Sequence, residues 1–245
     1  MQHKEDVPSE HLEHIGNYIV EKKPDVVICL GDFADMPSLS SYDVGKKNFE
    51  GRRYRSDIEA AQEGMHLLLQ PIWDFNARAR KNKEKQYNPR KILTLGNHED
   101  RITRAINGDP KLDGTIGLSD LKYEEYGWEV YPYLDVVMVN GIAYSHYFTS
   151  GVLGRPVTSA SALLGKKHQS CVMGHVQDRQ IAYGRRADGK QLLGLFAGSS
   201  YLHNEDYLGE QGNNYWRGIW MLHEVNDGAC DEMAVSLSYL KRRYG

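Results

Sequence analysis

Four apolar stretches of this sequence each end in side chains that bind metal ions or transfer protons. The stretches are "VVICLGDFAD", "ILTLGNHED", "AYSH" and "CVMGH", and their polar ends carry Asp32, Asp35, Asn97, His98, His146 and His175. A mixture of carboxylate, amide and imidazole groups suits manganese, iron or zinc. One such end alone is typical of a turn followed by a helix cap. Four of them favour a shared site, because α/β folds gather ligand groups at the carboxyl ends of strands.

Local patterns predict helices that alternate with these strands. A helix over 11–23 has one apolar face and ends before Pro24, where the first strand-like run begins. Ser56 and Glu59 have the spacing of a capping box, which predicts the start of a second helix. Pro71 is expected to kink or interrupt that helix, because proline lacks the amide hydrogen that a helix interior uses.

The second half of the chain is richer in turn signals. Asn140 and Gly141, between two strand-like runs, are the strongest short-range hairpin signal, and further hairpins are expected at 188–189 and 226–228. A short helix is expected over 159–164. These elements indicate an α/β fold with a mixed sheet, and the lack of a repeat or a low-complexity linker favours one domain.

Composition excludes several other classes of protein. The 245 residues include 40% apolar and 26% charged side chains, and the formal net charge is -3, so the whole chain is not a cationic nucleic-acid binder. No run is apolar enough for a membrane span, and the polar start lacks a signal-peptide core. The three separated cysteines indicate a reduced, intracellular protein. We therefore expect a cytoplasmic protein with no membrane partner.

The four strand ends resemble, in order, motifs of the calcineurin-like metallophosphoesterase superfamily: GDxxD, GNHE, a separate histidine and GHxH. They extend over residues 31–177. The segments "SLSSYD" and "GNHEDR" are also similar to segments of small phosphoesterases often encoded by bacteriophages. The resemblance implies a metallophosphoesterase-like α/β/β/α sandwich of two mixed sheets flanked by helices, formed by a single domain over 1–245.

The resemblance also implies a dinuclear metal site. In it, Asp32 would bridge two divalent ions, and Asn97, His146 and His175 would complete the second site. Manganese is the expected metal, with iron, zinc or magnesium as alternatives. Two ions about 3.5 to 4 Å apart would activate a bridging hydroxide as the nucleophile.

The remaining polar residues near "GNHED" receive other roles. The resemblance implies that His98 is the general acid for the leaving oxygen and that Asp35 orients it, which suits a group that titrates near neutral pH. Glu99 and Asp100 are expected to cap the helix that follows. Arg101 and the later His203 are candidate substrate contacts, with an ordinary surface charge and an ordinary loop residue as the alternatives.

Two departures from the family pattern concern the first metal site. Family members begin with a strand that ends in DxH, whereas this sequence starts "MQHKED", so the first strand is expected to be missing and Gln2 occupies the histidine position. A fragment cut inside the motif, or a gene model begun at an internal methionine, would explain this; a disordered start without a role is the alternative. In "GHVQ", Gln177 replaces the second histidine. We expect this first site to be weak and to prefer manganese or magnesium to zinc.

The expected reaction is therefore hydrolysis of a phosphate ester. A phosphodiester, including one in nucleic acid, is favoured by the basic segment at 78–91 and by the many tyrosines, although a solvated helix end explains that segment more simply. A phosphomonoesterase or protein phosphatase is the nearest alternative. An alternative of another class is a metal-binding or interaction protein whose catalysis is weakened.

Overall fold

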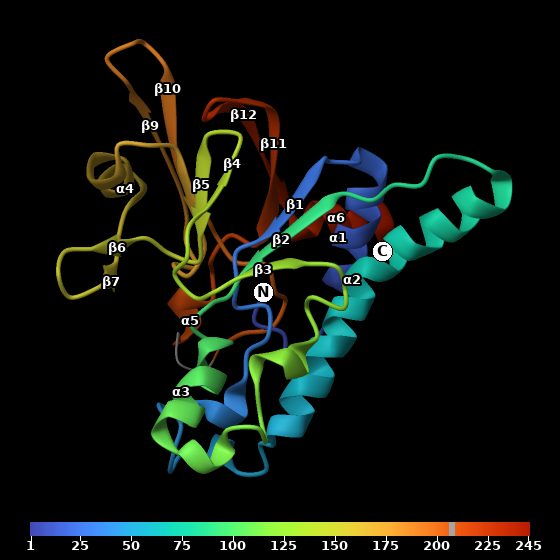
Figure 1. The fold of residues 1–245 in the computed structure, drawn as a ribbon, viewed down its shortest axis with the longest axis vertical. Helices are drawn as coiled ribbons and strands as arrows, with labels where there is room; N and C mark the ends of the chain where they lie inside the picture. Colours follow the sequence, from blue (N-terminus) through green and yellow to red (C-terminus); the bar gives the residue numbers. More distant parts are fainter. Residues whose placement is uncertain (206–208) are drawn as a thin grey trace.

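Helices and strands alternate along the first half of the chain, and strands dominate the second half (Figure 1). A computed structural model describes residues 1–205 and 209–245. Its α-helices are α1 (Glu10–Lys22), α2 (Tyr54–Asn82), α3 (Asp100–Gly108), α4 (Ala160–Lys167), α5 (Gly209–Gly212) and α6 (Leu237–Tyr244). Short 3-10 helices are η1 (Pro37–Leu39), η2 (Lys47–Phe49), η3 (Pro110–Leu112) and η4 (Leu118–Leu121). The fold is therefore mixed α/β.

The strands of the described chain form two larger sheets and two hairpin ladders. The first sheet is parallel, in the order β1 (Val26–Cys29), β2 (Arg90–Thr94), β3 (Glu129–Tyr131). The second has the order β4 (Val137–Val139), β5 (Ile142–Ser145), β8 (Cys171–Met173), β10 (Gln191–Ala197), β9 (Arg179–Arg185). In it, β5, β8 and β10 are parallel, and β4 and β9 are antiparallel edges. The ladders are β11 (Gly218–Asn226) with β12 (Ala229–Ser236), and β6 (Thr149–Ser150) with β7 (Arg155–Pro156).

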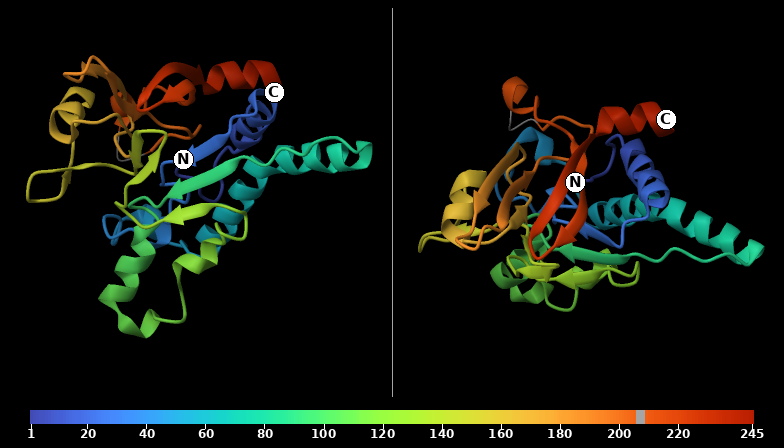
Figure 2. Two further views of the ribbon diagram at one scale, coloured as in Figure 1. Left: turned by 45° about the horizontal axis from the view of Figure 1, so that its top comes forward. Right: turned by 90° about the horizontal axis from the view of Figure 1, so that it is seen from above.

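Apolar side chains from both large sheets meet in a shared cluster. Ile92 of β2 lies in this cluster with Ile142 of β5 and Leu195 of β10. A second cluster joins the first sheet to α1, α2 and α6, and a third joins α4 to the second sheet. Figure 2 shows α1, α2 and α6 on the side of the first sheet, with α4 beside the second. The carboxyl ends of β1, β2, β5 and β8 thereby face one region between the sheets.

The helix α2 differs from prediction at both features that the sequence singled out. It begins at Tyr54 after the extended residue Arg53, so Ser56 is already helical and the predicted capping box is wrong. It also runs unbroken through Pro71, so of the two expected outcomes, a kink or an interruption, the interruption is wrong. The reason is tertiary contact: Pro71 is buried against Gly16 of α1, where a side-chain carbon would lie 2.9 Å from its ring. Packing against α1 offsets the hydrogen bond that proline removes.

The local turn predictions are confirmed. Val139 pairs with Ile142, and the two residues between them, Asn140 and Gly141, have positive φ angles of 46° and 84°, as a tight hairpin requires. Hairpins also join β9 to β10 and β11 to β12 at the expected turns. The expected short helix is α4, whose cap Ser159 accepts a hydrogen bond from the amide of Ala162.

Across the two described ranges, every helix is too short or too polar to cross a membrane.

Candidate metal centre

The loops after β1 and β2 approach each other through two facing glycines. A Cβ on Gly31 would lie 2.5 Å from the carbonyl of Thr94 and 2.6 Å from the amide of Gly96, and one on Gly96 would overlap Asp32. Gly31 also has φ of 82°, a conformation that glycine adopts without steric cost. Asp32 follows with φ of 50°, which is uncommon for a residue with a side chain. The glycine that ends each strand therefore lets the backbone turn Asp32 toward the second loop.

The side chain of Glu99 connects these two loops by accepting hydrogen bonds from the backbone of both. Its buried carboxylate accepts hydrogen bonds from the amides of Asp32 at 2.9 Å, Phe33 at 2.7 Å, Ala34 at 3.1 Å and Gly96 at 2.9 Å. Glu99 and Asp100 lie at the N-cap and in the first turn of α3, as expected, but the side chain of Glu99 makes no capping hydrogen bond. A carboxylate matched to four backbone donors instead fixes the loop that carries Asp32.

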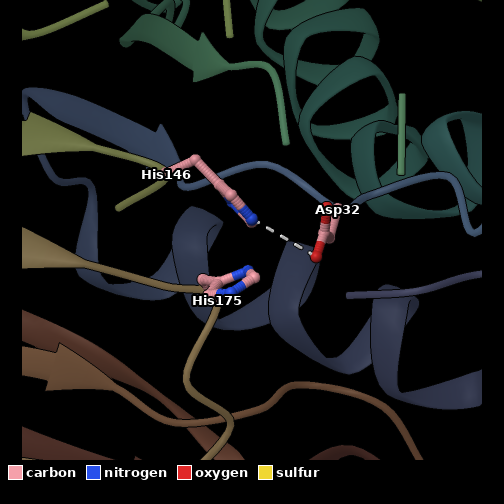
Figure 3. A group of neighbouring side chains, drawn as sticks. All are labelled: Asp32, His146 and His175. Atoms are coloured by element: carbon pink, nitrogen blue, oxygen red, sulfur yellow. Dashed lines mark ion pairs between the residues drawn. The ribbon is translucent and has the colours of Figure 1, made fainter. Parts of the chain in front are cut away.

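Four donor side chains from four strand ends converge beside these loops. Figure 3 shows Asp32, His146 and His175 pointing toward one another, and their ligand atoms lie within 4.8 Å of each other. Asn97 joins them: its Oδ1 lies 2.9 Å from Nε2 of His146 and 2.8 Å from Nδ1 of His175. Oδ2 of Asp32 lies 3.4 Å from Nε2 of His146. The structure thus brings together the predicted ligands of the second metal site.

The hydrogen bonds around His146 indicate that this cluster suits a cation. Nδ1 of His146 lies 2.6 Å from the carbonyl of Leu30, which only accepts, so Nδ1 carries the hydrogen. The other ring nitrogen, Nε2, faces the oxygens of Asn97 and Asp32. Burial, together with the neighbouring His146, lowers the pKa of His175 to about 4, so the His175 ring is neutral at pH 7. Lone pairs and a carboxylate converging on one point fit a divalent ion.

His98 faces the same region with its orientation fixed. Its Nδ1 lies 2.6 Å from Oδ1 of Asp35 and 3.0 Å from the Asp35 carbonyl, so Nδ1 donates to Asp35. Its Nε2 lies 3.8 Å from Oδ2 of Asp32. Burial lowers the pKa of His98, but the carboxylates of Asp32 and Asp35 outweigh burial and raise it above its ordinary value. The ring is therefore arranged to hold a proton on the Nε2 that points at the cluster.

The two glutamines of the expected first metal site bond to each other. Nε2 of Gln177 donates to Oε1 of Gln2 at 3.1 Å, and Oε1 of Gln177 accepts from the hydroxyl of Tyr201 at 2.7 Å. Gln2 Nε2 lies 3.4 Å from Nε2 of His98. The structure places Gln2 beside Asp32 and Gln177 against Gln2, but the two amide oxygens already accept hydrogen bonds in this arrangement. A metal ion at this position would have to displace those bonds.

The start of the chain is ordered against the first loop. His3 forms a parallel bridge with Ala34, and the amide of Asp35 donates to the carbonyl of His3 at 2.9 Å. The alternative of a disordered start without contacts is therefore wrong. The sequence carries no local signal for this pairing, because it joins residues about thirty positions apart.

A partly buried ion-pair network that the sequence did not reveal extends from Asp35. Nζ of Lys4 lies 3.1 Å from Oδ2 of Asp35 and 2.9 Å from Oε1 of Glu205. Nε2 of His203, a candidate substrate contact, lies 2.6 Å from the same Glu205 oxygen. Arg101, the other candidate, donates to the carbonyl of Asp35 at 2.7 Å. Both candidates therefore engage groups that surround Asp35.

Neither comparison with known proteins gives a relative. No protein-family model matches the chain. No curated protein matches it either. The family resemblance therefore rests on the sequence motifs.

Proposed function

We propose that this protein is a metallophosphoesterase that hydrolyses phosphate esters, with phosphodiesters as its first substrate class. The observation that supports this most is the convergence of Asp32, Asn97, His146 and His175 from four strand ends beside the oriented ring of His98. The shared apolar cluster between the sheets, with helices outside each, supports the metallophosphoesterase-like α/β/β/α sandwich.

In this proposal the four convergent side chains hold a divalent ion, and manganese is the metal expected ahead of the others. A bound divalent ion supplies Lewis-acid stabilisation of the negative charge that develops on a phosphoryl group. His98 gives the proton on Nε2 to the leaving oxygen, while Asp35 accepts the hydrogen bond from Nδ1 and stabilises the charged ring. Lys4 and Arg101 hold Asp35 in place from its other sides.

One observation favours a second candidate, a metal-binding protein whose catalysis is weakened. The amide oxygens of Gln2 and Gln177 are engaged by other side chains, whereas the ligand atoms of Asp32, His146 and His175 converge on one point. A single ion gives less charge stabilisation than a pair. The two candidates differ in turnover, and both require metal binding.

The test compares a model phosphodiester, bis(p-nitrophenyl) phosphate, with the monoester p-nitrophenyl phosphate in the presence of manganese. We expect faster hydrolysis of the diester, and His98→Ala should lower kcat by about a hundred- to ten-thousand-fold. Bound manganese, measured by elemental analysis, should be unchanged in this variant because His98 is outside the donor set. His66→Ala, on the exposed face of α2, is the matched control.

The other outcomes of these assays distinguish between the alternatives. If His98→Ala keeps full manganese-dependent turnover, His98 is not the general acid. A faster monoester reaction would move the substrate class to phosphomonoesters. Bound manganese without turnover of either substrate would favour the binding protein.

A further inference from the structure

The strand β9 is a long edge strand of the second sheet. It lies beyond β10 in the strand order, and Figure 1 shows it as the outermost strand there, with α4 nearby. Its seven residues include no proline and pair with β10 without a register shift. The other edge strands of the two large sheets, β1, β3 and β4, have only three or four residues. Because edge strands are usually short, bulged or interrupted by proline, β9 is a ready template for a further strand.

The hydrogen-bond pattern shows which backbone groups of β9 are free. The amide of Arg186 donates to the carbonyl of Lys190 at 2.8 Å, and this pair continues the register of β9 with β10. In an antiparallel ladder, bonded pairs alternate with non-bonded pairs. Counting back from Arg186 in steps of two, the even-numbered residues of β9 bond to β10. The amides and carbonyls of the odd-numbered residues, from Arg179 to Arg185, therefore point to the free side, where no described segment pairs with them.

The two faces of β9 differ in what covers them. The side chain of Gln180 accepts a hydrogen bond from the first amide of α4 at 3.1 Å, and a Cβ on Gly184 would lie 3.4 Å from Leu164 of the same helix. Even-numbered side chains thus lie on the side of α4. The odd-numbered Ile181 and Tyr183 lie on the opposite face and are 41% and 55% exposed. A strand added beside β9 would cover part of both apolar side chains.

A groove of about 450 Å³ lies between α4 and the end of β9. Gly165 of α4 and Gly184 of β9 leave room in it, and Leu164 and Leu192 make its lining apolar. A strand beside β9 would direct the side chain opposite Gly184 toward this groove. The groove therefore favours an apolar residue at that position of an added strand.

Positive charges cluster around the same edge. Beside β9, Arg186 and Lys190 are paired with Asp188 and Asp227. No described carboxylate forms an ion pair with four further cations, at the two ends of β9 and in the last turn of α4: Arg179, Arg185, Lys166 and Lys167. This excess of positive charge attracts a negatively charged partner.

These features decide between the possible occupants of the edge. A second copy fits poorly, because antiparallel self-pairing about Ala182 would set Arg179 of each copy against Arg185 of the other. A nucleic-acid backbone offers phosphate acceptors, whereas the free edge presents both N–H donors and carbonyl acceptors. An extended peptide matches both kinds of group, and carboxylates on it match the charge.

We propose that the free side of β9 binds an extended acidic peptide of a partner protein, which adds an antiparallel sixth strand to the second sheet. Its carboxylates face Arg179 and Arg185 at the two ends. Its apolar side chains cover Ile181 and Tyr183 on one face, and one opposite Gly184 enters the groove on the other. Main-chain hydrogen bonds supply affinity in such complexes, and alternate side chains supply specificity. Binding at this edge needs neither a metal ion nor phosphoester hydrolysis, so it can hold even if the proposed function fails.

The test is fluorescence anisotropy of the full chain with a labelled peptide, Glu-Leu-Val-Thr-Val-Thr-Glu. In the proposed register its first glutamate faces Arg185, its leucine faces Gly184, and its valines face Tyr183 and Ile181. We expect binding, and N-methylation of both valine amides, which point to β9, should weaken it at least about tenfold. N-methylation of the central threonine, whose amide points away from β9, is the matched control and should change the affinity by less than about twofold.

Hydrogen exchange locates the bound peptide on the chain. The peptide should slow exchange of the odd-numbered amides within 179–185 at least about tenfold, because each gains a partner, and should leave the first sheet unchanged. The peptide with N-methylated valines should give no such protection.

Charge reversal tests the register. Arg185→Glu should weaken binding about three- to tenfold, because it sets two like charges opposite each other. A peptide whose first residue is lysine should recover that loss with this variant. Lys81→Glu, which reverses an exposed charge in the last turn of α2, is the control and should change neither affinity.

Several results would overturn the proposal. One is no binding of the peptide, and another is equal binding after N-methylation of both valines, which would leave only charge and apolar contact. A thymidine heptanucleotide that displaces the peptide and binds more tightly would make this edge a nucleic-acid contact. Protection of the odd-numbered amides that rises with the concentration of the protein alone would make the occupant a second copy. The comparison of the peptides uses one unchanged protein, so it does not depend on the folding of a variant.

Discussion

At the scale of single residues, Glu99 fixes the loops of the candidate site although it is not one of the proposed metal ligands. Its carboxylate accepts from four backbone amides and from the hydroxyl of Tyr123 at 3.3 Å. Hydrogen bonds to a charged acceptor are stronger than those between neutral groups, and the roughly four lone-pair sites of a carboxylate match the four backbone amides. The conformation of Asp32 therefore depends on a residue of the second loop.

We predict that Glu99→Gln destabilises the protein by roughly 2 to 4 kcal/mol and weakens manganese binding. The amide of glutamine keeps one acceptor oxygen but turns an NH2 group toward backbone N–H donors, so buried donors lose their partners. Urea unfolding and calorimetric titration with manganese would measure the two effects. Glu59→Gln, on an exposed face of α2, is the control and should change neither by much. Unchanged stability of Glu99→Gln would contradict the proposed loop-fixing role.

Asn97 and His98 illustrate what the sequence reveals about the site and what it does not. Residue type and position after a strand are local properties, so the donors at the four strand ends could be proposed from the sequence. The partners of Glu99, Lys4 and Glu205 could not, because those contacts join distant segments and follow no local pattern. Metal-competent side chains are visible in a sequence, whereas the groups that hold them are found only in the folded chain.

At the scale of elements, the crossing of α1 and α2 is set by a glycine. A Cβ on Gly16 would overlap the carbonyl of Leu68 and lie 2.9 Å from Cγ of Pro71. The two helices therefore approach more closely than any side chain would allow at this point. The same contact explains how α2 tolerates a buried proline in its interior.

We predict that Gly16→Ala destabilises the protein by about 1 to 3 kcal/mol, because the added methyl group forces the helices apart. Gly165→Ala is the matched control: this glycine lies in α4 with no atom within 4 Å of the added carbon. There the higher helix propensity of alanine should stabilise the protein by up to about 1 kcal/mol. Thermal unfolding of both variants would show opposite shifts. Stabilisation by Gly16→Ala would contradict the close packing of α1 against α2.

Elements whose boundaries depend on adjacent residues were the predictable ones. The turn at Asn140 and Gly141 and the cap at Ser159 are satisfied within a few residues, so the sequence locates them. The start of α2 is different: the side chain of Asp57 accepts from the amide of Ser38, and the helix begins earlier than the local cap signal. Contacts with a neighbouring loop override local propensity there.

At the scale of the whole molecule, the direction of β2 separates the basic segment from the candidate metal centre. Residues 78–91 lie at the end of α2 and the amino end of β2, whereas Asn97 follows the carboxyl end of β2. Figure 1 shows this end of α2 projecting away from the strands. A five-residue strand is about 16 Å long, which exceeds the screening length of about 8 Å at physiological ionic strength. The basic segment is therefore a weak argument for a nucleic-acid substrate.

We predict that replacing Lys81, Lys83 and Lys85 with serine leaves kcat/KM for a single-stranded oligonucleotide within about twofold at 0.15 M salt, because screening removes their field at the metal centre. Arg104→Ser should lower it several-fold under the proposed function, since this exposed arginine of α3 donates to the carbonyl of Asn97 at 2.8 Å and so lies beside the candidate metal centre. Steady-state kinetics at low and physiological salt would measure both. If the triple variant instead loses tenfold or more and the loss fades at high salt, the substrate contacts the end of α2. An extended nucleic acid would then have to reach from that end of the molecule to the metal centre, and the active surface would extend beyond the strand ends.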